Sequence, residues 1–451
     1  MSDIHSKFLK MEVSENLFSL KSSNGTYFWD LVRREVFAIV NSKNSHEKSN
    51  NFEKKTLLTN IGGYFKDLIK EVLNYISMQY IIRKKPYYIF TSFQRSIKNG
   101  RLYDNIIDDL IDLVKDDALC VEYENKNEIS KYQLILGGKT KVPPVYVYTS
   151  KNVDNIDEIN SIISTKIYHH FDLNINFSKT ILECLQTFNS TESFYIKLFK
   201  KHAPKKIICT DNGSLKGLFS AARKNDIEIA EIQHGASPGS ILWTYDKSLD
   251  YQNDGVYMPT TFMTFSKYWS KTIDYPSKEK IEIGNNNFFQ PQIKGKNGIC
   301  FISNNQFHDD FIRLAIELEE IDYEQHIFYK LHPQQFEKKE LIMNQLPKNS
   351  KIKIVANELS LTKLFEECSY FIAVRSSLIY TALQAGKNIL IYKKYNYDWD
   401  KILLKSSITF LTAHEINYAI NNTMNNKNTS LEENVYFKKL DSSKFLKFLN
   451  R

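Results

Sequence analysis

The chain opens with helical patterning and then changes to short apolar runs that alternate with amphipathic segments. Residues 27–40 (YFWDLVRREVFAIV) and 57–82 have the spacing of helices, so the first 85 residues are predicted to be helical. Further along, the apolar runs 206–210 (KIICT) and 227–233 flank a helical segment at 215–224. Because strand, helix and strand follow one another so closely, this unit predicts parallel strands of one sheet.

The second half of the chain repeats this alternation more clearly. Its strand-like runs are 298–303 (GICFIS), 326–331 (HIFYKL), 370–374 (YFIAV) and 388–392 (NILIY), with helical segments between them. Strands that are apolar along nearly their whole length are buried on both faces, which is typical of a doubly wound parallel sheet.

We therefore predict an α/β protein with two facing Rossmann-like domains. The expected organisation is a helical segment at 1–85, a first domain at 86–260, a second domain at 261–440 and a closing helix at 441–451, with the break between domains near 255–285. In open α/β sheets ligands bind beyond the carboxyl ends of the strands, so a cleft between these ends is the expected site.

Composition excludes several classes of protein. The 451 residues are 42% hydrophobic, no run is long enough to span a bilayer, and no secretory signal is expected at the N-terminus. Five scattered cysteines fit a reducing cytosol and exclude a disulfide scaffold. The net charge of +8 favours anionic ligands, but it is not concentrated enough to predict a nucleic-acid partner. We expect a cytoplasmic protein, with contact to an inner membrane left open.

Polar residues follow the strands of the second domain. Lys330 and His332 end one strand, and Arg375, Ser376 and Ser377 lead from another into a helix. A helix N-terminus with serine hydroxyls and an arginine suits a phosphate, and an imidazole can stabilise charge on a departing diphosphate. The alternatives are a serine that merely caps the helix and a structural histidine.

The first domain offers candidates for the opposite side of the cleft. Asp211 and His234 follow neighbouring strands, and either can take a proton from an acceptor hydroxyl. The alternative for Asp211 is an ordinary turn. Arg95 lies in a loop after an earlier strand, where it either meets an acceptor or is simply solvated. The chain has no P-loop, HExxH, GxSxG or glycine-rich dinucleotide motif.

These strand ends resemble those of the GT-B glycosyltransferases that build bacterial capsules and lipopolysaccharides. The resemblance rests on the His-Gly at 234–235, the Lys-Leu-His-Pro at 330–333 and the serine pair at 376–377, and it extends over roughly 85–440. Bacterial polysialyltransferases, capsule Kdo transferases and CDP-glycerol glycerophosphotransferases are the comparisons. Polysialyltransferases have two acids before a glycine where this chain has Asp211-Asn212-Gly213, so His234 competes with Asp211 as the base.

The resemblance implies transfer from a nucleotide-activated sugar, without a metal or other cofactor, and with inversion at the sugar. It implies that His332, Ser376 and Ser377 contact the donor phosphates and that Glu358 lies near the nucleoside. The expected partners are a CMP-, CDP- or UDP-linked sugar and an oligosaccharide or lipid-linked saccharide acceptor of a bacterial surface polysaccharide. A polyol-phosphate transferase, a non-catalytic assembly protein and a sugar-nucleotide epimerase stay open as alternatives.

Overall fold

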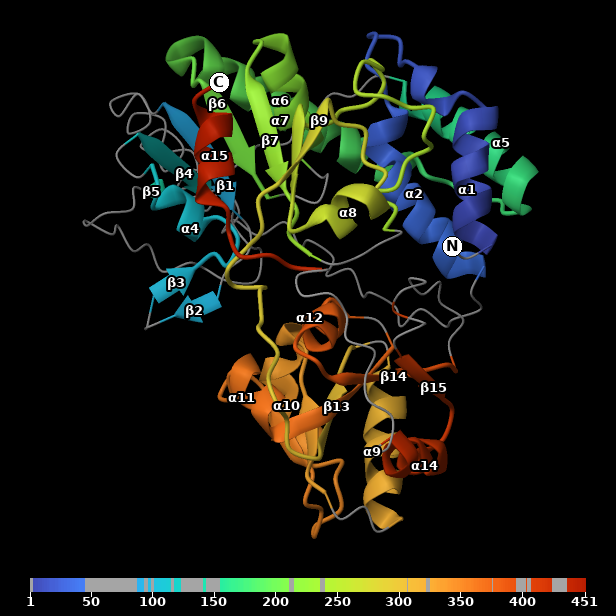
Figure 1. Ribbon diagram of the computed structural model, residues 1–451. Coiled ribbons are helices and arrows are strands. Elements are labelled where there is room, and N and C mark those ends of the chain that lie inside the picture. The colour runs from blue at the N-terminus through green and yellow to red at the C-terminus, as the bar shows by residue number, and fades with distance from the viewer. Residues whose placement is uncertain are drawn as a thin grey trace, which may run out of the picture.

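The protein consists of two α/β domains, one above the other in Figure 1. The predicted helix at 57–82 lies outside the residues that the structure describes. This computed structural model describes residues 3–44, 87–92, 96–98, 101–114, 117–122, 141–142, 155–210, 215–235, 240–305, 307–321, 325–374, 376–394, 403, 407–423 and 436–451.

The first domain is built on a seven-stranded sheet whose strands all run parallel. Its central strand β6 is buried along its whole length, as the apolar run at 206–210 predicts. In spatial order the strands are β5 (Lys141–Val142), β4 (Ala118–Glu122), β1 (Tyr88–Ser92), β6 (Lys206–Cys209), β7 (Glu228–Ile232), β8 (Thr261–Thr264) and β9 (Glu279–Glu282).

The second domain has a six-stranded parallel sheet. Numbered within the domain, its strands lie in the order 3-2-1-4-5-6, which is the Rossmann order. The first sheet has the same order with one strand added at its edge. The strands of the second sheet are β12 (Lys353–Val355), β11 (Ile327–Lys330), β10 (Gly298–Ile302), β13 (Cys368–Ala373), β14 (Asn388–Tyr392) and β15 (Ser407–Phe410).

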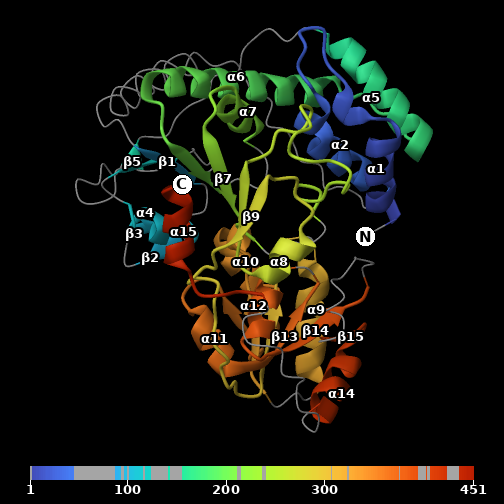
Figure 2. The ribbon, with the colours of Figure 1, turned by 45° about the horizontal axis from the view of Figure 1, so that its top comes forward.

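Helices surround both sheets, and Figure 2 shows α6 crossing the first domain above α7. The first domain carries α1 (Asp3–Ser14), η1 (Leu17–Ser19), α2 (Trp29–Asn44), α4 (Asp108–Ile111), α5 (Ile156–Phe171), α6 (Ser178–His202), α7 (Lys216–Lys224), α8 (Lys267–Thr272) and the hairpin β2 (Ser96–Lys98) and β3 (Arg101–Tyr103). The second carries α9 (His308–Glu320), η2 (Pro333–Lys338), α10 (Lys339–Met343), α11 (Leu361–Glu367), α12 (Leu378–Gln384) and α14 (Ala413–Thr423). No helix of the described ranges is both long and apolar enough to cross a bilayer.

The first sheet extends past the boundary that the sequence predicts at 260. Strands β8 and β9 pair with β7 and with each other, so the chain leaves the first domain only after Glu282. Pro259 and Pro276, which lie within the break expected near 255–285, are in the segments before β8 and β9 and therefore inside the first domain. The closing helix α15 (Ser442–Leu449) returns to the first domain, where Phe445 and Phe448 are buried in the same cluster as Phe90.

The carboxyl edges of the two sheets face each other. Helix α8 follows the carboxyl end of β8, and α12 follows that of β13. The rings of Trp269 in α8 and Tyr380 in α12 meet edge to face, with their centroids 5.2 Å apart. The Trp269 indole also donates a hydrogen bond of 2.6 Å to the carbonyl of Tyr436, in the segment that leads from the second domain back to α15. This contact sets the ends of the two sheets opposite one another.

Candidate functional site

The strand order defines one switch point in each domain. The order reverses between β1 and β6 in the first sheet and between β10 and β13 in the second. Ligands of doubly wound sheets bind outside the carboxyl ends at such points, because the connections there diverge to opposite faces. The residues that follow β6, β7, β11 and β13, at or next to these switch points, are therefore the candidates for a ligand site.

In the second domain, the structure holds Lys330 and His332 at the carboxyl end of β11. The side chain of buried Gln335 accepts a hydrogen bond of 2.9 Å from the backbone nitrogen of His332, and its own backbone nitrogen donates one of 2.8 Å to the His332 carbonyl. Burial, and then the charge of Lys330, lower the pKa of His332. The His332 imidazole is therefore neutral at pH 7, and a neutral imidazole can donate one N–H to an anion.

Lys330 connects this strand end to the next one. Its ammonium donates to the carbonyl of Ala356, just beyond β12, and lies 5.2 Å from the centre of the Phe336 ring. Burial lowers the pKa of Lys330. The ammonium is thus held rigidly beside His332 by a neutral carbonyl and a ring, and no carboxylate neutralises it by a hydrogen bond among the described residues.

Glu358 lies beside this pair. It accepts a hydrogen bond of 3.1 Å from the backbone nitrogen of Ala356 and pairs with Lys339 at 2.5 Å. Partial burial opposes ionisation, but the Lys339 ammonium and the backbone amides outweigh it and lower the pKa of Glu358 to about 2. The half-exposed carboxylate is therefore a permanent hydrogen-bond acceptor at this edge.

Ser376 and Ser377 lie between β13 and α12. The Ser376 hydroxyl accepts a hydrogen bond of 3.2 Å from the backbone nitrogen of Leu378, so it caps the helix locally. Ser377 is exposed and makes no such capping bond. Because β10 separates β11 from β13, the serines begin about 10 Å from the end of β11, two strand spacings away.

In the first domain, His234 follows β7 and lies against Trp243, with the ring centroids 5.3 Å apart and edge to face. Its Nδ1 atom is buried and has no hydrogen-bond partner among the described residues. Burial lowers the pKa of His234 to about 4. The imidazole is therefore neutral at physiological pH and has an unsatisfied polar atom at the carboxyl edge of the sheet.

Thr210, which was not predicted from the sequence, is a second buried polar group at this edge. It follows β6, which pairs with β7, and it is 2% exposed. Its hydroxyl, too, has no partner in the described ranges. Burying a hydroxyl without a hydrogen-bond partner destabilises the folded protein, and a bound ligand is one group that can supply the partner. The sequence shows Thr210 only as the end of the apolar run KIICT, directly before Asp211, which does not distinguish it from other threonines at strand ends.

The structure thus brings together Lys330, His332 and Glu358, while His234 lies across from them in the other domain. Asp211, Arg375 and Arg95 lie outside the described residues, and their roles stay predictions. Gln335 was also missed, although its position three residues after His332 is a common spacing for a local side-chain-to-backbone bond. Across the described ranges, no group of three or more His, Cys, Asp or Glu side chains is arranged to hold a metal.

Comparison with known proteins gives likenesses of fold. No protein-family model matches the sequence, and no curated protein matches it either. Among solved structures, the chain is similar to UDP-GlcNAc 2-epimerase from Methanocaldococcus jannaschii (11% identity, 80% of this chain and 98% of that one, TM-score 0.49). It is also similar to MurG from Acinetobacter baumannii (12% identity, 81% and 99%, TM-score 0.46) and to the glycotransferase of kitacinnamycin (11% identity, 76% and 91%, TM-score 0.47). The two Rossmann-ordered sheets define the fold of this chain independently of these likenesses.

Proposed function

We propose that this protein is a glycosyltransferase that moves a sugar from a nucleotide-activated donor to a growing bacterial surface polysaccharide. The observation that carries the proposal is that the carboxyl edges of the two sheets, which face each other, present side chains suited to different ligand groups. The second sheet presents Lys330 and His332, which suit a phosphate, and the first presents the neutral imidazole of His234, which suits a hydroxyl. A reaction between a phosphate-bearing donor and a hydroxyl acceptor uses both edges.

In the proposed reaction the acceptor hydroxyl attacks the anomeric carbon of the donor sugar, and the bond from that carbon to the nucleotide phosphate breaks. His332 and Lys330 stabilise the negative charge that the leaving phosphate gains, as fixed donors do for developing charge. His234 takes the proton of the hydroxyl. The bound donor's negative charge raises the pKa of a nearby imidazole, which makes His234 a stronger base when the donor is present.

The capsule or O-antigen role, the inverting outcome and the absence of a metal rest on the sequence resemblance. The acceptor is proposed to be an oligosaccharide or a lipid-linked saccharide, delivered at the face of the inner membrane. Glu358, which stays ionised, suits the hydroxyls of a nucleoside ribose. Ser377 suits the donor phosphates, and Asp211 is the competing base.

The test is a thermal-shift panel with CMP, CDP, UDP and GDP on the wild type, His332→Ala and His326→Ala. His326 is exposed and precedes β11, at the opposite end of the strand from His332, so it is a matched control. A nucleotide at 100 times its Kd stabilises the folded protein by about 2.7 kcal/mol. We expect one nucleotide to stabilise the wild type and His326→Ala but not His332→Ala. If no nucleotide binds, the proposed function is wrong.

A transfer assay separates the remaining alternatives. With the nucleotide identified, the corresponding sugar donor and a saccharide acceptor are expected to give a longer saccharide that contains no added phosphorus. Phosphorus in the product would instead establish a polyol-phosphate transferase, and a changed donor without an acceptor would establish an epimerase.

A further inference from the structure

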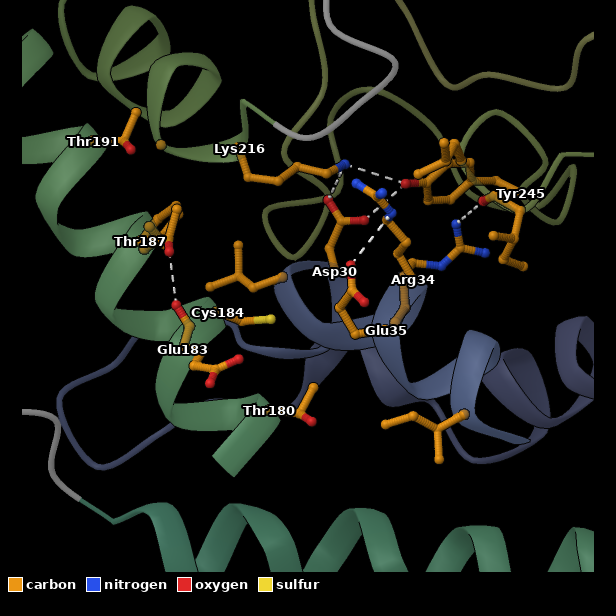
Figure 3. Close-up of a pocket in the computed structure, with 17 residues that line it drawn as sticks. Asp30, Arg34, Glu35, Thr180, Glu183, Cys184, Thr187, Thr191, Lys216 and Tyr245 are labelled. Carbon is orange, nitrogen blue, oxygen red and sulfur yellow. Dashed lines mark hydrogen bonds and ion pairs between the residues drawn. The ribbon is translucent and has the colours of Figure 1, made fainter. Parts of the chain in front are cut away.

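A pocket of about 440 Å³ lies in the first domain, between α2 and α6 (Figure 3). Its lining comes from residues 30–39, from 180–191, from Lys216 and Gly217 and from 241–245, and we name it the α2–α6 pocket. Its volume falls within the range of about 300–1,000 Å³ that is usual for small-molecule sites. None of these lining segments belongs to the second domain, so the pocket is separate from the donor residues.

The floor of the pocket is a buried charge network that is already satisfied. The guanidinium of Arg33 binds Glu12 at 2.7 Å and the carbonyl of Ile241 at 2.6 Å. Lys216 pairs with Asp30 at 2.9 Å and lies within hydrogen-bond distance of the Tyr245 hydroxyl and the Tyr257 carbonyl. An anionic ligand would have to displace these partners, so the floor offers little to a phosphate or a carboxylate.

The walls carry polar groups of both kinds. Thr180, Glu183 and Thr187 lie on one face of α6, at positions i, i+3 and i+7, and Figure 3 shows them beside the pocket. Across from them on α2, Arg34 and Glu35 pair at 3.4 Å while both are about half exposed. The Thr187 hydroxyl already donates to the Glu183 carbonyl at 2.8 Å, so the walls can donate to a ligand through the Arg34 guanidinium and the Thr180 hydroxyl and accept from it through the carboxylates and the Thr187 oxygen.

The lining is electrically balanced and partly apolar. Its basic residues, Arg33, Arg34 and Lys216, are matched in number by Asp30, Glu35 and Glu183, and Leu31, Ile39, Ile241 and Leu242 supply apolar surface. A ligand with many hydroxyls, no net charge and carbon–hydrogen faces fits this combination, whereas an anion or a purely apolar chain does not.

We propose that the α2–α6 pocket binds a neutral saccharide. Two of its lining segments connect to the carboxyl ends of the first sheet along the chain, since Lys216 follows β6, and 241–245 follows β7 and His234. That the saccharide is part of the acceptor rests on the proposed function. That a neutral saccharide binds in this pocket does not, because it follows from the lining residues alone.

The test is binding to an array of neutral and acidic oligosaccharides, followed by titration of the best ligand. The key variant is Thr187→Trp, which places a large ring in the pocket from an exposed position. The control is Ser193→Trp, because Ser193 is exposed on the same helix and does not line the pocket. Glu183→Gln keeps the shape and removes the charged acceptor, and its melting temperature together with that of Thr187→Trp shows that the variants fold.

We expect a neutral saccharide to bind the wild type and Ser193→Trp equally, to fail to bind Thr187→Trp, and to bind Glu183→Gln about tenfold more weakly, since hydrogen bonds to charged groups are the stronger ones. The proposal is overturned if no saccharide on the array binds, if only acidic ones bind, or if Thr187→Trp leaves binding unchanged.

His332→Ala separates this proposal from the proposed function. That variant is expected to keep saccharide binding while it loses nucleotide binding. If the protein binds a saccharide but no nucleotide, the saccharide site in the α2–α6 pocket is supported and the proposed glycosyltransferase function is overturned. If it binds a nucleotide but no saccharide, the saccharide site is overturned and the proposed function is supported.

Discussion

The neutral, buried imidazole of His234 makes a specific prediction about stability. Burial lowers the pKa of His234 to about 4 in the folded protein, whereas an unfolded chain has the ordinary value of about 6.5. Between these two values the unfolded state binds more protons than the folded state, so stability is lost as the pH falls. At pH values well above 6.5 the imidazole is neutral in both states and has no such effect.

The size of the effect follows from the two pKa values. Complete protonation would cost about 3.4 kcal/mol, since the difference of about 2.5 pKa units corresponds to 1.36 kcal/mol per unit. Between pH 7 and pH 5, where the folded state stays mostly neutral, the linkage relation gives a loss of about 2 kcal/mol. His234→Gln removes this loss because an amide does not titrate.

The measurement is urea unfolding at pH 7 and at pH 5 for the wild type and His234→Gln, with His326→Gln as a control for replacing an exposed histidine. Carboxylates and the other histidines titrate in both the wild type and His234→Gln, so their contributions cancel in the difference, and His326→Gln shows the effect of losing an exposed histidine. We expect His234→Gln to gain about 2 kcal/mol on the wild type between pH 7 and pH 5. Parallel pH profiles for the two proteins would refute the reasoning that His234 is buried in its neutral form.

Two further predictions concern the scaffold. Arg33→Met leaves the carboxylate of Glu12 buried without its guanidinium, and we expect it to lower the stability of the first domain by about 3–5 kcal/mol in urea unfolding, whereas an unchanged midpoint would contradict the buried pair. Gly284 has a φ of +72°, and a Cβ there would lie 2.2 Å from the carbonyl oxygen of Lys439. Gly284→Ala is therefore expected to cost at least about 1–3 kcal/mol and to make 436–451 more sensitive to limited proteolysis, and equal cleavage rates would contradict this.

The fold was predictable to the extent that its strands are buried. Runs such as GICFIS and KIICT are apolar along their length, and both are buried strands at the centre of a parallel sheet. The domain boundary was not predictable, because β9 is a half-buried edge strand (EKIE) with no apolar signal. Helix α1 lies within the segment that the sequence predicts to be helical, but its bounds were not predicted, since its sequence DIHSKFLKMEVS mixes polar and apolar positions.

The candidate site was predictable where it depends on strand ends and not where it depends on tertiary burial. His332 and His234 could be named because each follows an apolar run. Their neutral state could not, because it comes from burial and from Lys330, which only the folded chain supplies. Thr210 was invisible for the same reason: a threonine at a strand end is common, and only its unpartnered, buried hydroxyl distinguishes it.

The unsatisfied groups of the first domain also bear on which residue acts as the base. Thr210 and His234 follow the adjacent strands β6 and β7, which are about 4.8 Å apart; Thr210 lies one residue, and His234 three residues, beyond the Cys209–Glu231 pair. A threonine hydroxyl can donate to the acceptor oxygen while the imidazole takes its proton, and each group then gains the partner that it lacks. Asp211 follows Thr210 directly in the sequence and competes with His234 for this proton. A carboxylate, however, is ionised without a contact from a buried hydroxyl, so it gives no reason for the position of Thr210. Under the proposed function, these two atoms, which have no partner among the described residues, support His234 as the base and Thr210 as the residue that orients the acceptor.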